Sequence, residues 1–330
     1  MKSNDESSTT GAGSVSGEPR PVGGPTAIVI GEALVDEFDD GRSVVGGAPL
    51  NVAWNLAGFG LSPRFVSALG SDERGDRIFS AMRDWGLGTD GLVRRDDHET
   101  GVVRVTLRSG QPSYEIVFPA AYDFIPGPER FAGSGFLPAP ADPHAEASAP
   151  ILYLGTLAWR HRDSRHVLQS WIERFGQRRF VDINIRAPWF DRSLMEPLVR
   201  GARYVKLNDD ELSELAEHPC ESEEEIRQAV SRFRRRYGGD TFFVTCGSRG
   251  AYAVTDQELR FSPAPPPEPL RDTVGAGDAF AAATIAALLR GTSPTRCLAA
   301  GVRFAARVCT LQGATSTDRT LYQTDWSDHP

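Results

Sequence analysis

Asp272-Thr-Val-Gly-Ala-Gly-Asp-Ala-Phe280 is the most informative segment of this chain, and an apolar run, AAATIAALL, follows it at 281–289. The apolar run predicts a buried helix. The glycines before it let backbone N–H groups converge, and the helix adds the positive end of its dipole. Gly275, Ala276 and Gly277 are therefore predicted to form an anion hole suited to a phosphate.

Asp278 lies in the first turn of this predicted helix. A carboxylate is out of place in a loop that only holds an anion. It makes sense as a general base that takes a proton from a hydroxyl attacking the bound phosphate. The alternative is an aspartate that merely caps the helix. The chain contains no GxxxxGK[ST], so the loop is not a Walker A loop, and the loop itself does not match GxGxxG, so a dinucleotide fingerprint is weak.

Strand and helix patterns alternate on both sides of this segment, which predicts an α/β fold with a parallel sheet. The segment SEEEIRQAVSRFRRRYGG at 222–239 predicts one of the helices, with Ser222 and Glu225 at capping-box spacing. The expected strands are short, apolar and often β-branched; they lie at 26–30, 64–70, 151–159, 178–186, 204–208 and 241–247.

Residues 101–119, GVVRVTLRSGQPSYEIVFP, interrupt this alternation. Two runs with a period of two flank a Ser-Gly-Gln-Pro turn, which is typical of an antiparallel hairpin. Such a piece inside an α/β chain indicates a lid or a small second domain. Its exposed strand edges also suggest pairing across a homodimer.

Composition excludes several function classes. The chain has 330 residues and a net charge of −8, from 36 Lys+Arg against 44 Asp+Glu, which argues against bulk nucleic-acid binding. The longest apolar-leaning stretch, at 279–289, is far shorter than the roughly 20 residues of a membrane span. Four cysteines without a CxxC pair indicate a reducing, cytoplasmic compartment.

Two segments are predicted to lie outside the packed core. Residues 1–25 are rich in Ser, Thr, Gly and Pro and are expected to form a disordered tail. Residues 137–149 are rich in Pro and Ala and are expected to form a surface loop.

The segment DTVGAGDAF resembles the C-terminal signature of the ribokinase-like (PfkB) carbohydrate kinases. GGAPLNVA at 46–53, followed by LGSDERGDRI, resembles the N-terminal signature of the same family. The similarity runs from about residue 26 to 316. It implies an ATP- and Mg²⁺-dependent sugar kinase with a ribokinase-like three-layer α/β/α sandwich and a small β-sheet lid. Residues 26–330 would form the kinase domain, with a discontinuous lid from about 36–47 and 98–122.

The resemblance assigns Asp278 as the catalytic base and gives three further positions to the sugar. Asp36 matches an aspartate that hydrogen-bonds sugar hydroxyls, and Gly47 and Asn51 match sugar-contacting positions. Glycine lets the backbone approach a ligand, and asparagine offers both a donor and an acceptor. From the residues alone, Asp36 also fits a turn and Asn51 a plain helix start.

The resemblance places the nucleotide at three other segments. Asn208 and Glu211 match an NxxE element that organises Mg²⁺ and the phosphates, largely through water. Without the family, Asp209, Asp210 and Glu211 would fit the acidic first turn of a helix. The loop that approaches the ATP phosphates is matched by Thr245, Gly247 and Gly250. Asp272 and the Val274 carbonyl match part of a monovalent-cation site, and K⁺ dependence is left open.

Substrate choice rests on local similarities. Three segments are more similar to the fructokinase branch than to ribokinase: GEALVDEF, GGAPLNVA and DINIR. Fructose is therefore the leading candidate substrate. Arg186 ends the DINIR segment and is predicted to reach a substrate oxygen or the transferred phosphoryl group, with a structural salt bridge as the alternative. Kinases of 2-keto-3-deoxygluconate, ribose or nucleosides stay open, as does a catalytically silent sugar-binding protein on the same scaffold.

Overall fold

A computed structural model describes residues 26–108, 111–137, 149–324 and 326. The tail expected at 1–25 and most of the loop expected at 137–149 lie outside these residues. Among the described residues, no helix has both the length and the apolar character needed to cross a bilayer.

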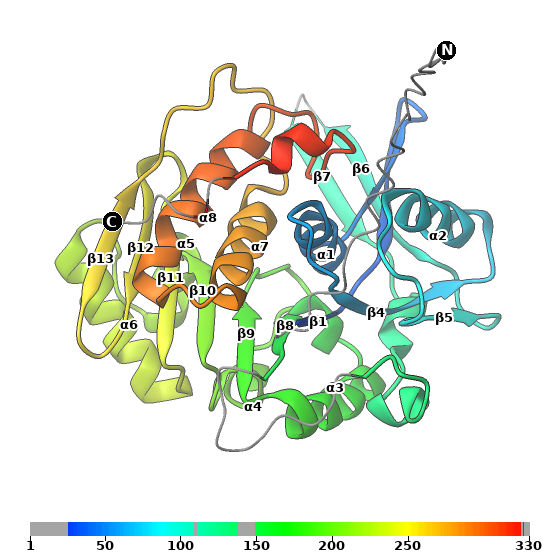
Figure 1. The fold of residues 1–330 in the computed structure, drawn as a ribbon, viewed down its shortest axis with the longest axis horizontal. Helices are drawn as coiled ribbons and strands as arrows, with labels where there is room; N and C mark the ends of the chain where they lie inside the picture. The colour runs from blue at the N-terminus through cyan, green and yellow to red at the C-terminus, as the bar shows by residue number, and fades with distance from the viewer. Residues whose placement is uncertain (1–25, 109–110, 138–148, 325, 327–330) are drawn as a thin grey trace, which may run out of the picture.

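The described residues form two sheets (Figure 1). The larger sheet has nine strands in the order β13-β12-β11-β10-β9-β8-β1-β4-β5. Seven strands, from β11 to β5 in this order, pair in parallel, and β12 and β13 add an antiparallel edge. Their bounds are β1 Ala27–Ile30, β4 Arg64–Gly70, β5 Leu92–Arg95, β8 Ile151–Gly155, β9 Arg178–Asp182, β10 Tyr204–Asn208, β11 Thr241–Thr245, β12 Gly250–Val254 and β13 Leu259–Pro263.

Helices cover both faces of the larger sheet, because alternate strand residues point to opposite sides. Val29, Tyr153 and Phe243 pack toward one set of helices, and Ile30, Leu154 and Val244 toward the other. The first set is α1 Ala48–Gly58, α2 Glu73–Trp85, α7 Ala276–Leu289 and α8 Pro294–Val308. The second is α3 Arg162–Phe175, α4 Met195–Val199, α5 Asp209–Ala216 and α6 Glu223–Tyr237.

The smaller sheet has the strand order β3-β2-β6-β7. β2 pairs with β6 in parallel, and the two outer pairs are antiparallel. The strands of this sheet overlap segments 36–47 and 98–122, which were expected to form a lid. The edge strands are β3 and β7. Their pairing across a homodimer stays a prediction. The bounds are β2 Leu34–Phe38, β3 Ser43–Gly46, β6 Gly101–Arg108 and β7 Gln111–Ile116.

The expected three-layer α/β/α architecture with a second, small β-sheet is confirmed by this arrangement. Several details differ from the sequence-based expectation. The strands expected at 151–159, 178–186 and 241–247 end earlier, at Gly155, Asp182 and Thr245. A 3₁₀ turn follows the first of them at Leu157–Trp159. The antiparallel β12–β13 edge was not expected, because its short segments lack a strong alternating pattern.

Helix α7 lies between α1 and α8 in Figure 1. It is apolar on all sides and almost wholly buried, as expected for a helix in the interior of a large domain. Gly301 of α8 allows close packing, because a Cβ there would lie 2.7 Å from the Thr284 hydroxyl and 2.8 Å from the Phe280 ring. On its other side, α1 is held by the C-terminal segment, where the Trp54 indole donates to the Ser316 carbonyl (2.9 Å). These contacts fix where α7 begins.

Replacing Gly301 by alanine tests this packing. Alanine is the better helix former by about 1 kcal/mol, yet its methyl group would collide with α7. We expect Gly301→Ala to lower the free energy of unfolding by about 1–3 kcal/mol in urea titrations. Gly88→Ala, with nothing within 4 Å of its Cβ, should change it by less than about 0.5 kcal/mol. Equal stability of Gly301→Ala and wild type would contradict the packing.

Candidate active site

Four polar residues, two of them predicted for the site, lie at the carboxyl ends of the parallel strands. Asn208 ends β10 and Thr245 ends β11, and the two are register partners. Glu32 follows β1, and Asp182 ends β9. Ligands of open α/β sheets bind at this edge, so the topology brings together residues that are far apart in the sequence.

Asp278 lies in the first turn of α7 and does not cap it. Gly275 is the N-cap residue, and no side chain caps the helix. Instead, Asp278 Oδ2 accepts a hydrogen bond from Asn51 Nδ2 at 2.8 Å. The capping interpretation of Asp278 and the plain helix-start interpretation of Asn51 are therefore wrong, because the two side chains bond to each other across 227 residues.

The environment of Asp278 suits a base. Burial raises the pKa of Asp278 to about 6, and the negative charge of Asp182 adds to this effect. The Asn51 hydrogen bond and the charges of Lys206 and Arg186 act in the opposite direction. A carboxylate with a pKa close to the working pH is ionised yet basic enough to accept a proton.

In the glycine loop before α7, other parts of the chain come close to the backbone at Gly275 and at Gly277. Gly275 has φ +77°, and a Cβ there would lie 2.2 Å from the Ala314 Cβ, so only glycine fits. A Cβ at Gly277 would approach the Lys206 Nζ to 3.3 Å. The backbone N–H groups of 275–277 thus stand at the start of a buried helix with a buried ammonium group beside them. This arrangement attracts an anion.

Lys206 and Asp182 form an ion pair below this loop, which sequence reasoning missed. The Lys206 Nζ donates to both Asp182 oxygens at 2.8 and 3.0 Å, and the Tyr153 hydroxyl donates to Asp182 at 3.2 Å. Burial lowers the pKa of Lys206, but the charges of Asp182 and Glu211 outweigh it, so the pKa ends above its ordinary value. The sequence signal that could have revealed this pair is one charged residue in each of two apolar strands, because Lys206 of β10 and Asp182 of β9 are register partners.

Asp36 lies within β2, opposite Val44 and Val103. The turn interpretation of Asp36 is therefore wrong; the turn comes later, at 39–41. Burial raises the pKa of Asp36 to about 6. Gly47 is the N-cap of α1 with φ +112°, and a Cβ there would lie 2.5 Å from the Glu32 carbonyl oxygen. Gly47 thus lets the α1 backbone approach the segment after β1.

Asn208 and Glu211 form the capping box of α5. Asn208 Oδ1 accepts the Glu211 N–H at 2.7 Å, and Glu211 Oε2 accepts the Asn208 N–H at 2.9 Å. Glu211 Oε1 accepts the Ile185 N–H at 2.7 Å. Each oxygen of Glu211 keeps a second lone pair. The carboxylate therefore fits Mg²⁺ held through water, and the acidic helix start and the ligand role coexist.

The nucleotide-loop glycines differ in their surroundings. Gly247 has φ +55° and open space around its Cβ position, which leaves its backbone accessible to a ligand. Gly250 has φ +130°, and a Cβ there would lie 2.1 Å from the Ser262 carbonyl oxygen, so packing against β13 requires this glycine. The contacts of Thr245, Gly247 and Gly250 with ATP stay predictions.

Asp272 ties the glycine loop to the segment after α8. Its Oδ1 accepts the Val274 N–H and its Oδ2 accepts the Gly313 N–H, both at 3.0 Å. The two segments expected to form a monovalent-cation site, the one at Asp272–Val274 and the one after α8, are thus neighbours. The binding of a cation by Asp272 and the Val274 carbonyl stays a prediction.

Arg186 is exposed, and its Nη1 donates to the Ile185 carbonyl at 3.0 Å. None of the ion pairs found among the described residues includes Arg186, so the salt-bridge interpretation finds no support there. Its charge acts on both Asp278 and Glu32. Arg186 is thus close enough to the predicted base for its charge to favour the ionised form of Asp278.

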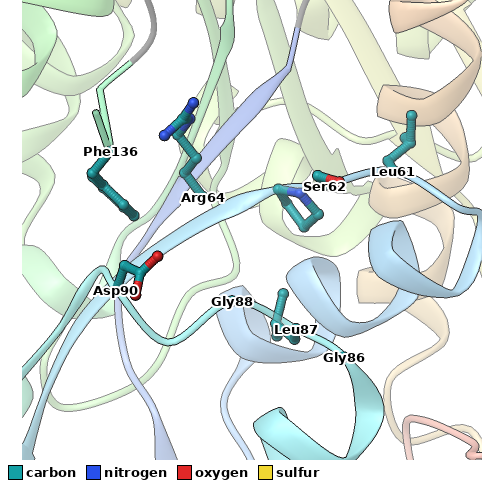
Figure 2. Close-up of a pocket in the computed structure, with 9 residues that line it drawn as sticks. Leu61, Ser62, Arg64, Gly86, Leu87, Gly88, Asp90 and Phe136 are labelled. Atoms are coloured by element: carbon teal, nitrogen blue, oxygen red, sulfur yellow. The ribbon is translucent and has the colours of Figure 1, made fainter. Parts of the chain in front are cut away.

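A separate cavity of about 350 Å³ lies at the opposite edge of the larger sheet, where β4 begins (Figure 2). Its lining includes Arg64, Asp90 and Phe136, and the Arg64 guanidinium lies 5.5 Å from the Phe136 ring. None of the residues predicted for the active site lines it. The cavity therefore plays no part in the site built around Asp278.

Comparison with known proteins defines the class. The model of the pfkB family carbohydrate kinases matches residues 26–321. The chain therefore belongs to the pfkB family, and it is an ATP-dependent carbohydrate kinase.

Three similar proteins illustrate the relationship. A fructokinase of Salmonella typhimurium is 28% identical over 280 residues, covering 81% of this chain and 85% of the relative. A Xylella fastidiosa fructokinase structure with bound ATP has a TM-score of 0.72 and 25% identity, covering 90% and 94% of the two chains. An aminoimidazole riboside kinase structure from Salmonella enterica has the same fold, with a TM-score of 0.74, 23% identity and coverage of 90% and 100%.

The pH dependence of this kinase tests the environment of Asp278. A base must be ionised to accept a proton, and Asp278 becomes protonated as the pH falls through its pKa of about 6. We expect kcat/KM to fall about tenfold per pH unit below that value. Coupling enzymes should be checked separately at each pH. An acid limb near the ordinary aspartate value, about 4, would contradict the raised pKa.

Proposed function

We propose that this kinase transfers the γ-phosphoryl group of ATP to a primary hydroxyl of a small sugar, with fructose the leading substrate. The observation that carries the proposal is the Asp278 carboxylate, with a pKa raised to about 6, held by Asn51 beside the glycine-rich start of α7. In this proposal the general base lies within one helical turn of the anion site.

The reaction follows from this juxtaposition. Asp278 accepts the proton of the sugar hydroxyl as its oxygen attacks the γ-phosphorus. The bond from phosphorus to the bridging β–γ oxygen breaks, and ADP leaves with that electron pair. The N–H groups of Gly275, Ala276 and Gly277 stabilise the negative charge on the phosphoryl oxygens during transfer. Lys206 adds positive charge below the loop.

The sugar would lie between the carboxyl edge of the larger sheet and the smaller sheet. Asn51 and Gly47 reach it from α1, and Asp36 reaches it from β2. Closing the smaller sheet over the sugar would exclude water that otherwise hydrolyses ATP. Arg186, whose charge reaches Asp278, would contact a substrate oxygen or the phosphoryl group.

The nucleotide would lie along the ends of β10 and β11, against Asn208, Thr245, Gly247 and Gly250. Mg²⁺ held through water at Glu211 would neutralise phosphate charge there. Fructose is the leading substrate because of the local sequence similarity and because a fructokinase of Salmonella typhimurium is among the similar proteins. Ribose, 2-keto-3-deoxygluconate and adenosine are the alternative acceptors, and sugar binding without turnover is the alternative function.

A coupled ADP-release assay over this panel tests the proposal. We expect sugar-dependent ADP release with wild type and a loss of about 10²- to 10⁴-fold in kcat for Asp278→Asn, because the amide cannot accept the proton. Asp84→Asn, an exposed change on α2, is the matched control and should keep full activity. Full activity of Asp278→Asn, or no turnover with any acceptor, would refute the assignment.

A second prediction concerns Glu211. Glu211→Gln retains the side-chain shape but removes the charge that orients the waters of Mg²⁺. We expect the Mg²⁺ concentration for half-maximal activity to rise about 10- to 100-fold. Glu214→Gln, an exposed change on the same helix, should leave it unchanged. The role of Glu211 would be excluded by an unaltered Mg²⁺ requirement in a folded Glu211→Gln protein.

A further inference from the structure

An arginine ties the loop after β11 to the start of α5. This loop, at 245–250, carries the three residues predicted to approach the ATP phosphates. Arg249 Nη2 donates a hydrogen bond to the Asp209 carboxylate, and Arg249 Nη1 donates one to the Glu221 carbonyl at 3.2 Å. One guanidinium thus joins the loop to the first turn of α5 and to the segment just before α6.

Asp209 makes a second bond to the same loop. Its carboxylate also shares a hydrogen bond with the buried thiol of Cys246, so two side chains of the loop converge on one acid. Asp209 lies between Asn208 and Glu211, inside the capping box that is predicted to organise Mg²⁺ and the phosphates. The ion pair of Arg249 and Asp209 therefore connects the two segments predicted to bind the nucleotide.

Backbone contacts alone do not fix the loop against α5. The larger sheet joins the two segments as far as Asn208 and Thr245, which are the last register partners of β10 and β11. Beyond them, the Arg249 N–H donates to the Cys246 carbonyl at 3.1 Å, and the Ala264 N–H donates to the Arg249 carbonyl at 3.2 Å. These bonds shape the loop and attach it to the end of β13. The bonds to α5 come from the side chains of Arg249 and Cys246.

An acid at position 209 is unfavourable beside a nucleotide unless it has another task. It lies next to predicted phosphate-binding residues in a chain of net charge −8, and like charges repel. The pair is also a weak source of stability, because the Arg249 and Asp209 side chains are 49% and 22% exposed. Its placement between two functional segments is better explained by their relative position than by the stability of the fold.

We propose that Asp209 and Arg249 are positioning residues for ATP, and that their ion pair holds the loop at 245–250 at a fixed spacing from the start of α5. This inference rests on the proposed function, because it assumes the nucleotide site described there. A loop that is already ordered spares ATP the entropy cost of ordering it on binding. Loss of the pair should therefore weaken the binding of ATP and leave the binding of the sugar unchanged.

Two single variants test the ion pair. We expect Arg249→Met and Asp209→Asn each to raise the KM for ATP about 3- to 10-fold, between the effects of an exposed ion pair and of a hydrogen bond to a charged group. The KM for the sugar should change less than about twofold. The sign is informative for Asp209→Asn, because removing a negative charge beside the phosphates would by itself lower the KM for ATP.

Neighbouring residues provide matched controls. Asp210→Asn removes an exposed carboxylate from the same turn of α5, and Arg260→Met removes an exposed arginine from β13. Neither should raise the KM for ATP. Thermal unfolding of each variant, compared with wild type, checks that the protein is folded.

The double variant separates positioning from direct contact. Arg249→Met combined with Asp209→Asn should bind ATP no more weakly than the weaker single variant, because both changes break the same pair. Arg249→Lys keeps the charge but loses the planar fork that reaches both Asp209 and the Glu221 carbonyl. Its KM for ATP should therefore lie between those of wild type and Arg249→Met.

Calorimetric titration with ATP and Mg²⁺, without sugar, measures the same shifts independently of turnover. Wild-type affinity for ATP in folded Arg249→Met and Asp209→Asn would overturn the positioning role. Weaker binding in Arg249→Met with unchanged or tighter binding in Asp209→Asn would also overturn it, because Arg249 would then contact ATP itself. The expected shifts without turnover of any sugar would support the positioning role and refute the proposed sugar transfer.

Discussion

The hydrogen bond from Asn51 Nδ2 to Asp278 Oδ2, 2.8 Å long, joins the two halves of the active site. Asn51 belongs to α1, which follows β3 of the smaller sheet, and Asp278 belongs to α7, which begins at the anion loop. One bond thus fixes the predicted sugar-binding helix relative to the predicted phosphate-binding helix. It also favours the ionised form of a carboxylate that burial would otherwise protonate.

The charges around this bond are arranged in compensating pairs. Asp182 opposes the ionisation of Asp278, whereas Lys206, which neutralises Asp182, favours it. Asp123 neutralises Arg160 in the same way, in a second ion pair whose side chains are both buried. Removing one member of such a buried pair is costly because it leaves an uncompensated charge. The net charge of −8 makes this local compensation important, since the site must still accept ATP.

The sequence predicted much of the site because several of its elements are local. The glycine loop, the first turn of α7 and the capping box of Asn208 and Glu211 each lie within about one helical turn, so spacing alone identifies them. Asn51 and Asp36 were assigned through the family resemblance. The alternation of strands and helices likewise predicted the larger sheet, because each strand is a continuous apolar run.

The residues that sequence reasoning missed are defined by contacts across the fold. Lys206 meets Asp182 only because β9 and β10 pair in register. Glu32, Tyr122 and Arg160 are buried residues from three separate segments of the chain, and no spacing links them. Burial gives them their significance, since an exposed glutamate, tyrosine or arginine needs no partner. Burial of a single polar residue has no signature in one sequence.

Asp278 is expected to be a desolvated carboxylate that is ionised at neutral pH. Carboxyl ¹³C NMR titration of the intact enzyme measures this directly, with Asp278→Asn identifying the signal by its loss. We expect a pKa of about 6 for Asp278 in the wild-type enzyme. In Asn51→Ala we expect a higher pKa for Asp278, because the hydrogen bond that favours the ionised form is gone. A pKa of about 4, unaffected by the loss of Asn51, would contradict it.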